Sequence, residues 1–132
     1  MTDLTPEQIA FLKEPNLGHV CTLMKDGQPQ STPVWIDWDG SYLVFNTAEG
    51  RQKPRNIARD PRVAVSVVDR NNGQRYLEIR GRVVEVVREG AREHLGMLAR
   101  KYAGPSARNP ASSDEVRLIM RIEPDHVTSL NF

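Results

Sequence analysis

The spacing of hydrophobic and polar positions divides the 132-residue chain into short helices and strands. Apolar residues at helical spacing predict three helices, at 6–13, 51–59 and 89–102. Alternation, or a high content of strand-favouring residues, predicts strands at 19–24, 30–38, 41–47, 63–68, 75–88, 115–123 and 127–130. This order of elements is typical of a mainly β, α+β fold in which helices decorate an antiparallel barrel.

Local signals indicate where several elements begin and turn. Thr5 with Gln8 three residues later has the form of a capping box, so the first helix is expected to start at this point. Asp26-Gly27 and Asp39-Gly40 are hairpin signals. The first three strands are therefore expected to form a meander.

Two later strands have distinctive patterns. The run 63–68 is almost continuously apolar, as in a strand buried on both faces at the centre of a barrel. The alternation over 75–88 is interrupted by Gly81, where a long strand is expected to bend or bulge. Residues 103–114 are polar and proline-rich and predict a loop.

The length predicts one domain, spanning 1–132, with one hydrophobic core. Cys21 is the single cysteine and has no partner for a disulfide or a CxxC pair, which favours a reducing compartment. The first residues lack a basic leader with a long apolar run, and no segment approaches the ~20 apolar residues of a membrane helix. We therefore expect a cytoplasmic, soluble protein with no membrane partner.

The charge is balanced overall but uneven locally. Eighteen basic residues face seventeen acidic ones, yet the segment 51–62 alone holds five basic residues and one acid. A small-barrel nucleic-acid binder is one interpretation, supported by this segment and by the strand aromatics Trp35, Tyr42, Phe45 and Tyr76. The balanced net charge and 6% aromatic content disfavour it, so we expect no nucleic-acid partner.

The same basic segment has the outline of an anion site. A strand ends in Asn46 and Thr47, Gly50 provides a turn, and Arg51 and Lys53 stand at the start of the next predicted helix. Free N–H groups at a helix N-terminus favour a phosphate, and arginine and lysine add charge-assisted hydrogen bonds. The alternative is that these residues form only a solvated helix face.

The sequence offers no acid–base, nucleophile or metal constellation. The three histidines, at 19, 94 and 126, are far apart and lack metal-binding spacing. Ser31 and Ser66 lack the GxSxG context of a hydrolase, and Cys21 is interpreted as a small buried hydrophobe. We therefore nominate no catalytic side chain and no metal ligand.

The chain resembles the pyridoxamine-5'-phosphate-oxidase-like split β-barrel flavoproteins, and within them the branch that uses the deazaflavin coenzyme F420. The segments that carry the resemblance are 18–23, 26–30, 31–35, 46–56, 60–64, 76–83 and 122–124. The resemblance implies an antiparallel split barrel of the FMN-binding type with short flanking helices. It also implies a homodimer with two cofactor sites at the subunit interface.

The resemblance further implies which residues contact the cofactor. The cofactor ring would lie along Ser31, Thr32, Pro33, Val34 and Trp35, and the linker of the cofactor would meet Asn46 and Thr47. The cofactor phosphate would meet Arg51, Gln52, Lys53 and Asn56. Arg75 and Tyr76 would reach the cofactor bound to the other subunit. An apolar slot with a few directed polar groups suits a planar ring. For Trp35 and Trp38, packing in the core or at a dimer interface is the competing interpretation, and the sequence alone favours it.

The implied function is an F420-dependent oxidoreductase that passes a hydride from reduced deazaflavin to a small unsaturated or quinone-like substrate. The alternative is an FMN-binding oxidoreductase of the flavin reductase or oxidase type. The additional basic residues Arg55 and Arg59 suit the acidic tail of F420. Pyridoxamine-phosphate oxidase activity itself is not expected, because the chain ends without the further C-terminal segment of those enzymes.

Overall fold

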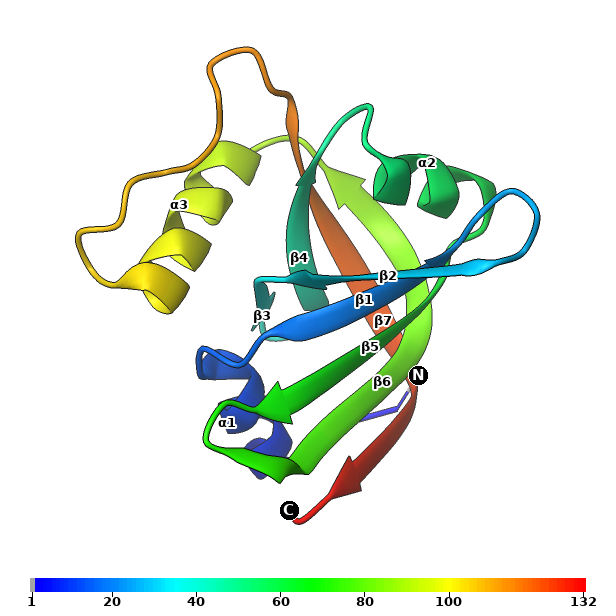
Figure 1. Cartoon of the computed structure of the whole chain (residues 1–132), viewed down its shortest axis with the longest axis vertical. Helices are drawn as coiled ribbons and strands as arrows, with labels where there is room; N and C mark the ends of the chain where they lie inside the picture. The colour runs from blue at the N-terminus through cyan, green and yellow to red at the C-terminus, as the bar shows by residue number, and fades with distance from the viewer. Residues whose placement is uncertain (1) are drawn as a thin grey trace.

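The computed structural model describes residues 2–132 as a curled, seven-stranded antiparallel sheet flanked by three short helices (Figure 1). The helices are α1 (Pro6–Lys13), α2 (Gln52–Arg59) and α3 (Ala91–Ala103); the strands are β1 (Gly18–Leu23), β2 (Pro29–Val34), β3 (Ile36–Trp38), β4 (Leu43–Ala48), β5 (Arg62–Asp69), β6 (Asn72–Val87) and β7 (Arg117–Leu130). The strand order is β2-β1-β5-β6-β7-β4-β3. The expected mainly β, α+β barrel-like fold is confirmed.

Side chains on the concave face of the sheet form the core. In β5, Val63, Val65 and Val67 are buried, whereas Ala64 is half-buried and Ser66 is exposed. The expectation that 63–68 is buried on both faces is therefore wrong for this chain, because β5 lies between β1 and β6 with only one face on the core. Cys21, expected inside, is half-buried for the same reason, since it alternates with the buried Val20 on β1.

The predicted single strand 30–38 is two strands that belong to opposite edges of the sheet. β2 pairs with β1, and β3 pairs with β4, so the expected three-strand meander is wrong. The chain leaves the ladder at Trp35, and the amide of Ile36 donates to the Tyr102 hydroxyl on α3 at 3.1 Å. Helix α3 thus satisfies the backbone at the point where the chain changes edges.

The predicted strands 115–123 and 127–130 are one strand, β7, which runs through Pro124. Pro124 lies opposite Gly81, where the β6–β7 register shifts and the ladder is irregular, so its missing amide hydrogen is tolerated. An added Cβ at Gly81 would lie 2.1 Å from the carbonyl oxygen of Glu123. The predicted bend at Gly81 is confirmed, and its cause is this close approach of two backbones.

The helices follow the local signals closely. Thr5 and Gln8 form the expected capping box of α1. Helix α2 starts one residue later than expected, and it buries Ile57 together with Asn56, while Ala58, expected inside, is exposed. The loop expected at 103–114 is present, but it spans 104–116, because α3 includes Ala103 and β7 starts at Arg117. Within residues 2–132, no helix is long and apolar enough to cross a membrane.

Candidate functional site

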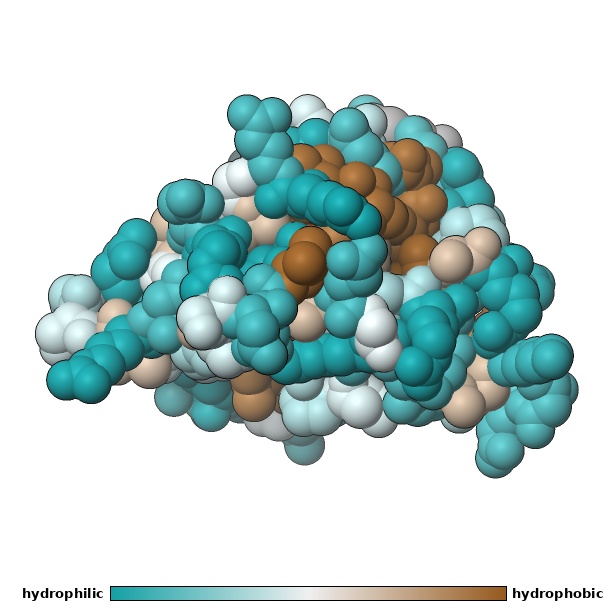
Figure 2. All heavy atoms as spheres, turned by 90° about the horizontal axis from the view of Figure 1, so that it is seen from above, coloured by the Kyte–Doolittle hydropathy of each residue, from teal (hydrophilic) through white to brown (hydrophobic). Residues whose placement is uncertain are grey.

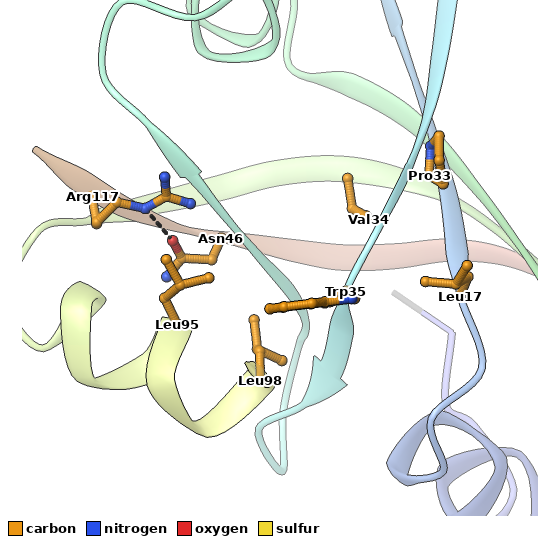
Figure 3. Close-up of a pocket in the computed structure, with 8 residues that line it drawn as sticks. All are labelled: Leu17, Pro33, Val34, Trp35, Asn46, Leu95, Leu98 and Arg117. Carbon is orange, nitrogen blue, oxygen red and sulfur yellow. Dashed lines mark hydrogen bonds between the residues drawn. The ribbon is translucent and has the colours of Figure 1, made fainter. Parts of the chain in front are cut away.

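Two adjoining cavities lie between β2, β4 and the helices α2 and α3. The first, of about 340 Å³, is largely apolar and is lined by Leu17, Pro33, Val34, Trp35, Asn46, Leu95, Leu98 and Arg117 (Figure 3). The second, of about 300 Å³, is basic and is lined by Pro33, Val34, Phe45, Asn46, Thr47, Arg51, Gln52 and Lys53. Three residues, Pro33, Val34 and Asn46, border both. The geometry therefore brings together most of the residues that the sequence nominated.

The basic cavity is built at the start of α2. Gly50 turns the chain with φ +89°, and Arg51 is the N-cap, so the amides of Gln52 and Lys53 open the helix without intrahelical acceptors. Burial and the neighbouring Arg51 lower the pKa of Lys53. Arg51 itself pairs with Glu115 at 2.6 Å. Among residues 2–132, the Lys53 ammonium has neither an ion-pair nor a hydrogen-bond partner, which makes it the group most available to an anion.

The apolar cavity has an aromatic wall. Trp35 extends from the end of β2 toward α3 (Figure 3) and stacks on Tyr102, with ring centroids 5.7 Å apart and planes 8° apart. The Tyr102 hydroxyl in turn donates to the carbonyl of Asn16 at 2.7 Å. Trp38 packs against the core, as expected. Trp35 instead lines the cavity, because the break between β2 and β3 turns its ring away from the core.

Arg117 is a site residue that the sequence interpretation missed. It is only 7% exposed, and its Nε donates to Asn46 Oδ1 at 2.9 Å, while Nη1 contacts Glu115 Oε1 at 3.3 Å. The Asn46 amide donates to the carbonyl of Ala91 at 2.8 Å and contacts His94 Nδ1 at 3.0 Å. Asn46 is thus largely committed to protein contacts. An arginine at a strand start gives no sequence signal of burial, so Arg117 emerges only from the tertiary structure.

Three other nominated residues lie beside the cavities rather than in their walls. Asn56 is fully buried on the inner face of α2, where its Nδ2 donates to Thr22 Oγ1 at 2.9 Å and its Oδ1 accepts from Gln52 at 2.7 Å. Ser31 is exposed, and Thr32 is half-buried on the same face of β2 as Val34. The amide of Asn56 supports Gln52 and does not line either cavity.

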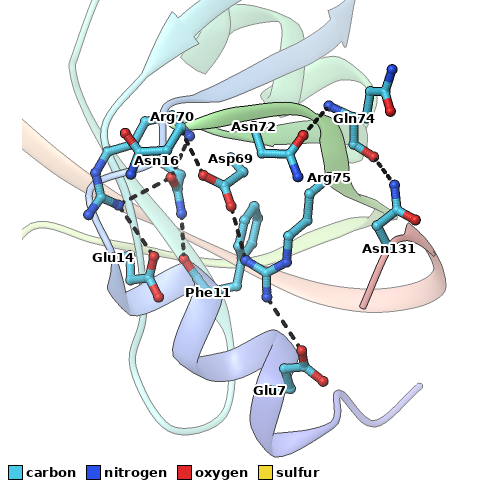
Figure 4. A network of polar contacts seen from close by, with 11 residues as sticks. Glu7, Phe11, Glu14, Asn16, Asp69, Arg70, Asn72, Gln74, Arg75 and Asn131 are labelled. Carbon is cyan, nitrogen blue, oxygen red and sulfur yellow. Dashed lines mark hydrogen bonds and ion pairs between the residues drawn. The ribbon is translucent and has the colours of Figure 1, made fainter.

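Arg75 and Tyr76 lie at the other end of the sheet, beside α1. The Arg75 guanidinium pairs with Asp69 at 3.2 Å and Glu7 at 3.5 Å (Figure 4), and it sits 4.2 Å from the Phe132 ring centroid. Within the chain, Arg75 therefore ties α1 and the C-terminus to β6. That these two residues reach the cofactor of another subunit stays a prediction.

Two titratable groups near the C-terminal end of α3, the helix that borders the cavity, have shifted pKa values that predict a pH dependence of stability at alkaline pH. Burial lowers the pKa of Lys101 to about 8 and raises the pKa of Tyr102 to about 12. From pH 8 to 10 the unfolded chain holds more protons at Lys101, so the free energy of unfolding should rise, by an amount of the order of 1 kcal/mol. Above pH 10 the folded chain holds more protons at Tyr102, so the free energy should fall.

Urea unfolding from pH 7.5 to 11.5 measures this dependence, with a maximum expected near pH 10. In a plot of the free energy of unfolding against pH, Lys101→Met should flatten the rise below pH 10, and Tyr102→Phe should flatten the fall above pH 10. These changes of slope are expected whatever effect each substitution has on overall stability. A native curve that falls steadily from pH 8 would contradict these assignments.

Comparison with known proteins places this geometry in a family. The model of the family described as pyridoxamine 5'-phosphate oxidase matches residues 4–131. The chain belongs to this pyridoxamine 5'-phosphate oxidase family. It is also similar to a solved structure named F420 reductase, with 38% sequence identity and a TM-score of 0.81; the match covers 90% of this chain and 94% of that one.

More distant solved structures show the same fold. A conserved hypothetical protein from Mycobacterium tuberculosis matches with a TM-score of 0.75 and 23% identity, covering 98% of this chain and 86% of that one. A putative pyridoxamine 5'-phosphate oxidase from Listeria innocua matches with a TM-score of 0.68 and 19% identity, covering 96% and 97%. At these identities the likeness supports the fold alone.

Proposed function

We propose that this protein is an oxidoreductase that binds the deazaflavin coenzyme F420, with the phosphate in the basic cavity and the ring along the Pro33–Val34 border that the two cavities share. It would reduce a small unsaturated or quinone-like molecule. The observation that carries the proposal is the half-buried Lys53 ammonium, which faces Arg51 and has no counter-ion within residues 2–132. A phosphate at the start of α2 would supply that counter-ion. The Pro33–Val34 border offers a surface for a planar ring, and the adjoining apolar cavity with Trp35 in its wall leaves room for a small substrate beside that ring.

Unpartnered polar atoms on β2 also fit a polar ligand beside this strand. The Thr32 hydroxyl and the Gln30 side-chain carbonyl oxygen are buried and have no hydrogen-bond partner in the described part of the chain. Both residues lie on the same face of β2 as Val34, which borders the two cavities. Buried polar atoms without partners are costly, so a ligand that meets them gains affinity.

Two considerations favour F420 over FMN. The similar structure with 38% identity is an F420 reductase. In addition, Arg55 and Arg59 donate to neutral acceptors, the carbonyls of Gly50 and Leu23, so their charges are not cancelled by carboxylates. This excess positive charge near the phosphate cavity suits a cofactor with an acidic tail.

Each wall of the site then has a role. Lys53, Gln52 and the helix amides would hold the phosphate, Thr47 would meet the linker, and the Pro33–Trp35 segment would orient the ring. When bound, the deazaflavin supplies the hydride. The protein orients the cofactor and substrate and excludes water from the apolar cavity.

We also propose that the protein is a cytoplasmic homodimer with the cofactor at the subunit interface, where Arg75 and Tyr76 would contact the partner's cofactor. An apolar surface supports this assembly. Figure 2 views the molecule from the end where β6 finishes and β7 begins. On this face, hydrophobic residues gather in a patch that hydrophilic residues border. Val84, Val86 and Val116, at this end, are exposed by 41–49%. Exposed apolar patches of this kind are common at protein interfaces. Light scattering of the purified protein tests the proposal, and we expect the mass of a dimer.

A turnover assay tests the proposed reaction. Protein mixed with reduced F420 and a quinone such as menadione should oxidise the cofactor well above the rate without protein. The matched arm uses FMN-loaded protein with reduced nicotinamide as the hydride source. Activity confined to that arm would contradict the F420 assignment and favour the FMN alternative.

A further inference from the structure

Arg117 presents a buried positive charge to the apolar cavity. Its Nε and Nη1 are occupied by Asn46 and Glu115, but Nη2 donates to no group within residues 2–132. The guanidinium extends from β7 over Asn46 toward the space beside Val34 (Figure 3). Arg117 stays protonated and is 7% exposed as a residue, and its Nη2 is not among the buried unpartnered atoms of residues 2–132, so an acceptor in the cavity can reach these N–H groups.

The charges around Arg117 are not balanced by the protein. Glu115 pairs through one oxygen with Arg117 and through the other with Arg51, so one carboxylate serves two guanidinium groups. Arg92, which contacts the carbonyls of Ser112 and Glu115, adds a third positive charge nearby. Burial, Arg51 and Arg92 lower the pKa of Arg117, whereas Glu115 raises it. An additional anion is therefore favoured at this end of the cavity.

The remaining walls restrict the shape of such an anion. Leu17, Leu95, Leu98 and the Trp35 ring offer no charged groups, and the Trp35–Tyr102 stack gives the cavity a flat aromatic side. A cavity of about 340 Å³ is at the lower end of the range for small-molecule sites. A compact, flat and mostly apolar molecule with one negative group fits these walls.

We infer that the apolar cavity takes the substrate, and that the substrate is a flat, largely apolar carboxylic acid whose carboxylate binds Arg117. This inference rests on the proposed function, because the basic cavity is then left for the cofactor phosphate. For a hydride acceptor, the class is an α,β-unsaturated aromatic acid. Arg117 acts as a substrate-binding residue, held in orientation by Asn46 and Glu115.

Calorimetric titration of the cofactor-free protein with trans-cinnamate and with its neutral amide, trans-cinnamamide, tests the inference. The native protein should bind the acid about 10-fold more tightly than the amide, the value of one buried charge-assisted hydrogen-bond pair. Arg117→Met should reduce this preference to less than about 2-fold. The control Arg62→Met removes the same charge from the exposed start of β5, outside the walls of both cavities, and it should keep the preference. A purely structural role for Arg117 would shift both affinities together.

Two results would overturn the inference. One is equal binding of cinnamate and cinnamamide to the native protein. The other is loss of cinnamate binding when the protein is saturated with F420, because such competition would assign Arg117 to the cofactor. If Arg117→Met does not fold, Arg117→Lys keeps the charge but loses the forked geometry and should lose at least half of the preference. Lys53→Ala should weaken F420 binding and keep the preference for cinnamate. Failure of F420 binding with an intact preference would contradict only the proposed cofactor.

Discussion

Replacing Lys53 with alanine should weaken binding of the cofactor about 10- to 100-fold while leaving the fold intact. The ammonium is half-buried, is repelled by Arg51 and has no protein partner among residues 2–132, so its removal costs the folded chain no ion pair. The free energy of unfolding should therefore stay within about 0.5 kcal/mol of the native value. Fluorescence titration with F420 and urea unfolding measure the two quantities.

The matched control is Lys25→Ala, which removes the same charge from the exposed β1–β2 turn. This variant should bind F420 with native affinity. If Lys53→Ala also binds with native affinity, the start of α2 is not the phosphate site, and the basic residues form only a solvated surface.

Gly81→Ala should be the most destabilising single methyl addition at a glycine of the sheet. The new Cβ would lie 2.1 Å from the Glu123 carbonyl oxygen, and a backbone atom cannot move aside as a flexible side chain can. We expect a loss of about 3 kcal/mol or more in the free energy of unfolding, measured in urea.

Gly73→Ala is the control for this prediction. Gly73 lies in the same strand, β6, but an added Cβ there would meet no atom within 4 Å. Its effect should stay within about 0.5 kcal/mol. Similar losses for the two variants would show that glycine flexibility, rather than contact with β7, explains the position of Gly81.

The elements that the sequence predicted well depend on local chemistry. Thr5 and Gln8 cap α1 through contacts three residues apart, and Gly81 marks a bend because β-strands use glycine where backbones approach closely. The Arg51–Lys53 segment was recognisable because the start of a helix and its charges are adjacent in sequence. In each case the pattern and its physical cause occupy the same short stretch of chain.

The features that the sequence did not predict depend on contacts between distant residues. The separation of β2 from β3 needs the Tyr102 hydroxyl, 66 residues away from Ile36, to accept its amide hydrogen. Asn56 donates to the Thr22 hydroxyl, 34 residues away, and Arg117 is buried through Asn46, 71 residues away. Such partners leave no periodicity in the sequence, so the walls of the apolar cavity contributed by α3 and Arg117 became recognisable only with the fold, whereas its Pro33–Trp35 wall was already nominated through the family resemblance.

The most direct test of the central claim is a pair of dissociation constants. Cofactor-free protein would be titrated with F420 and with FMN under one buffer and salt condition, each followed by fluorescence. The proposed function predicts clearly tighter binding of F420, because Arg55 and Arg59 add positive charge that its acidic tail can use. Tighter binding of FMN would contradict the F420 assignment, and binding of neither would contradict the cofactor site itself.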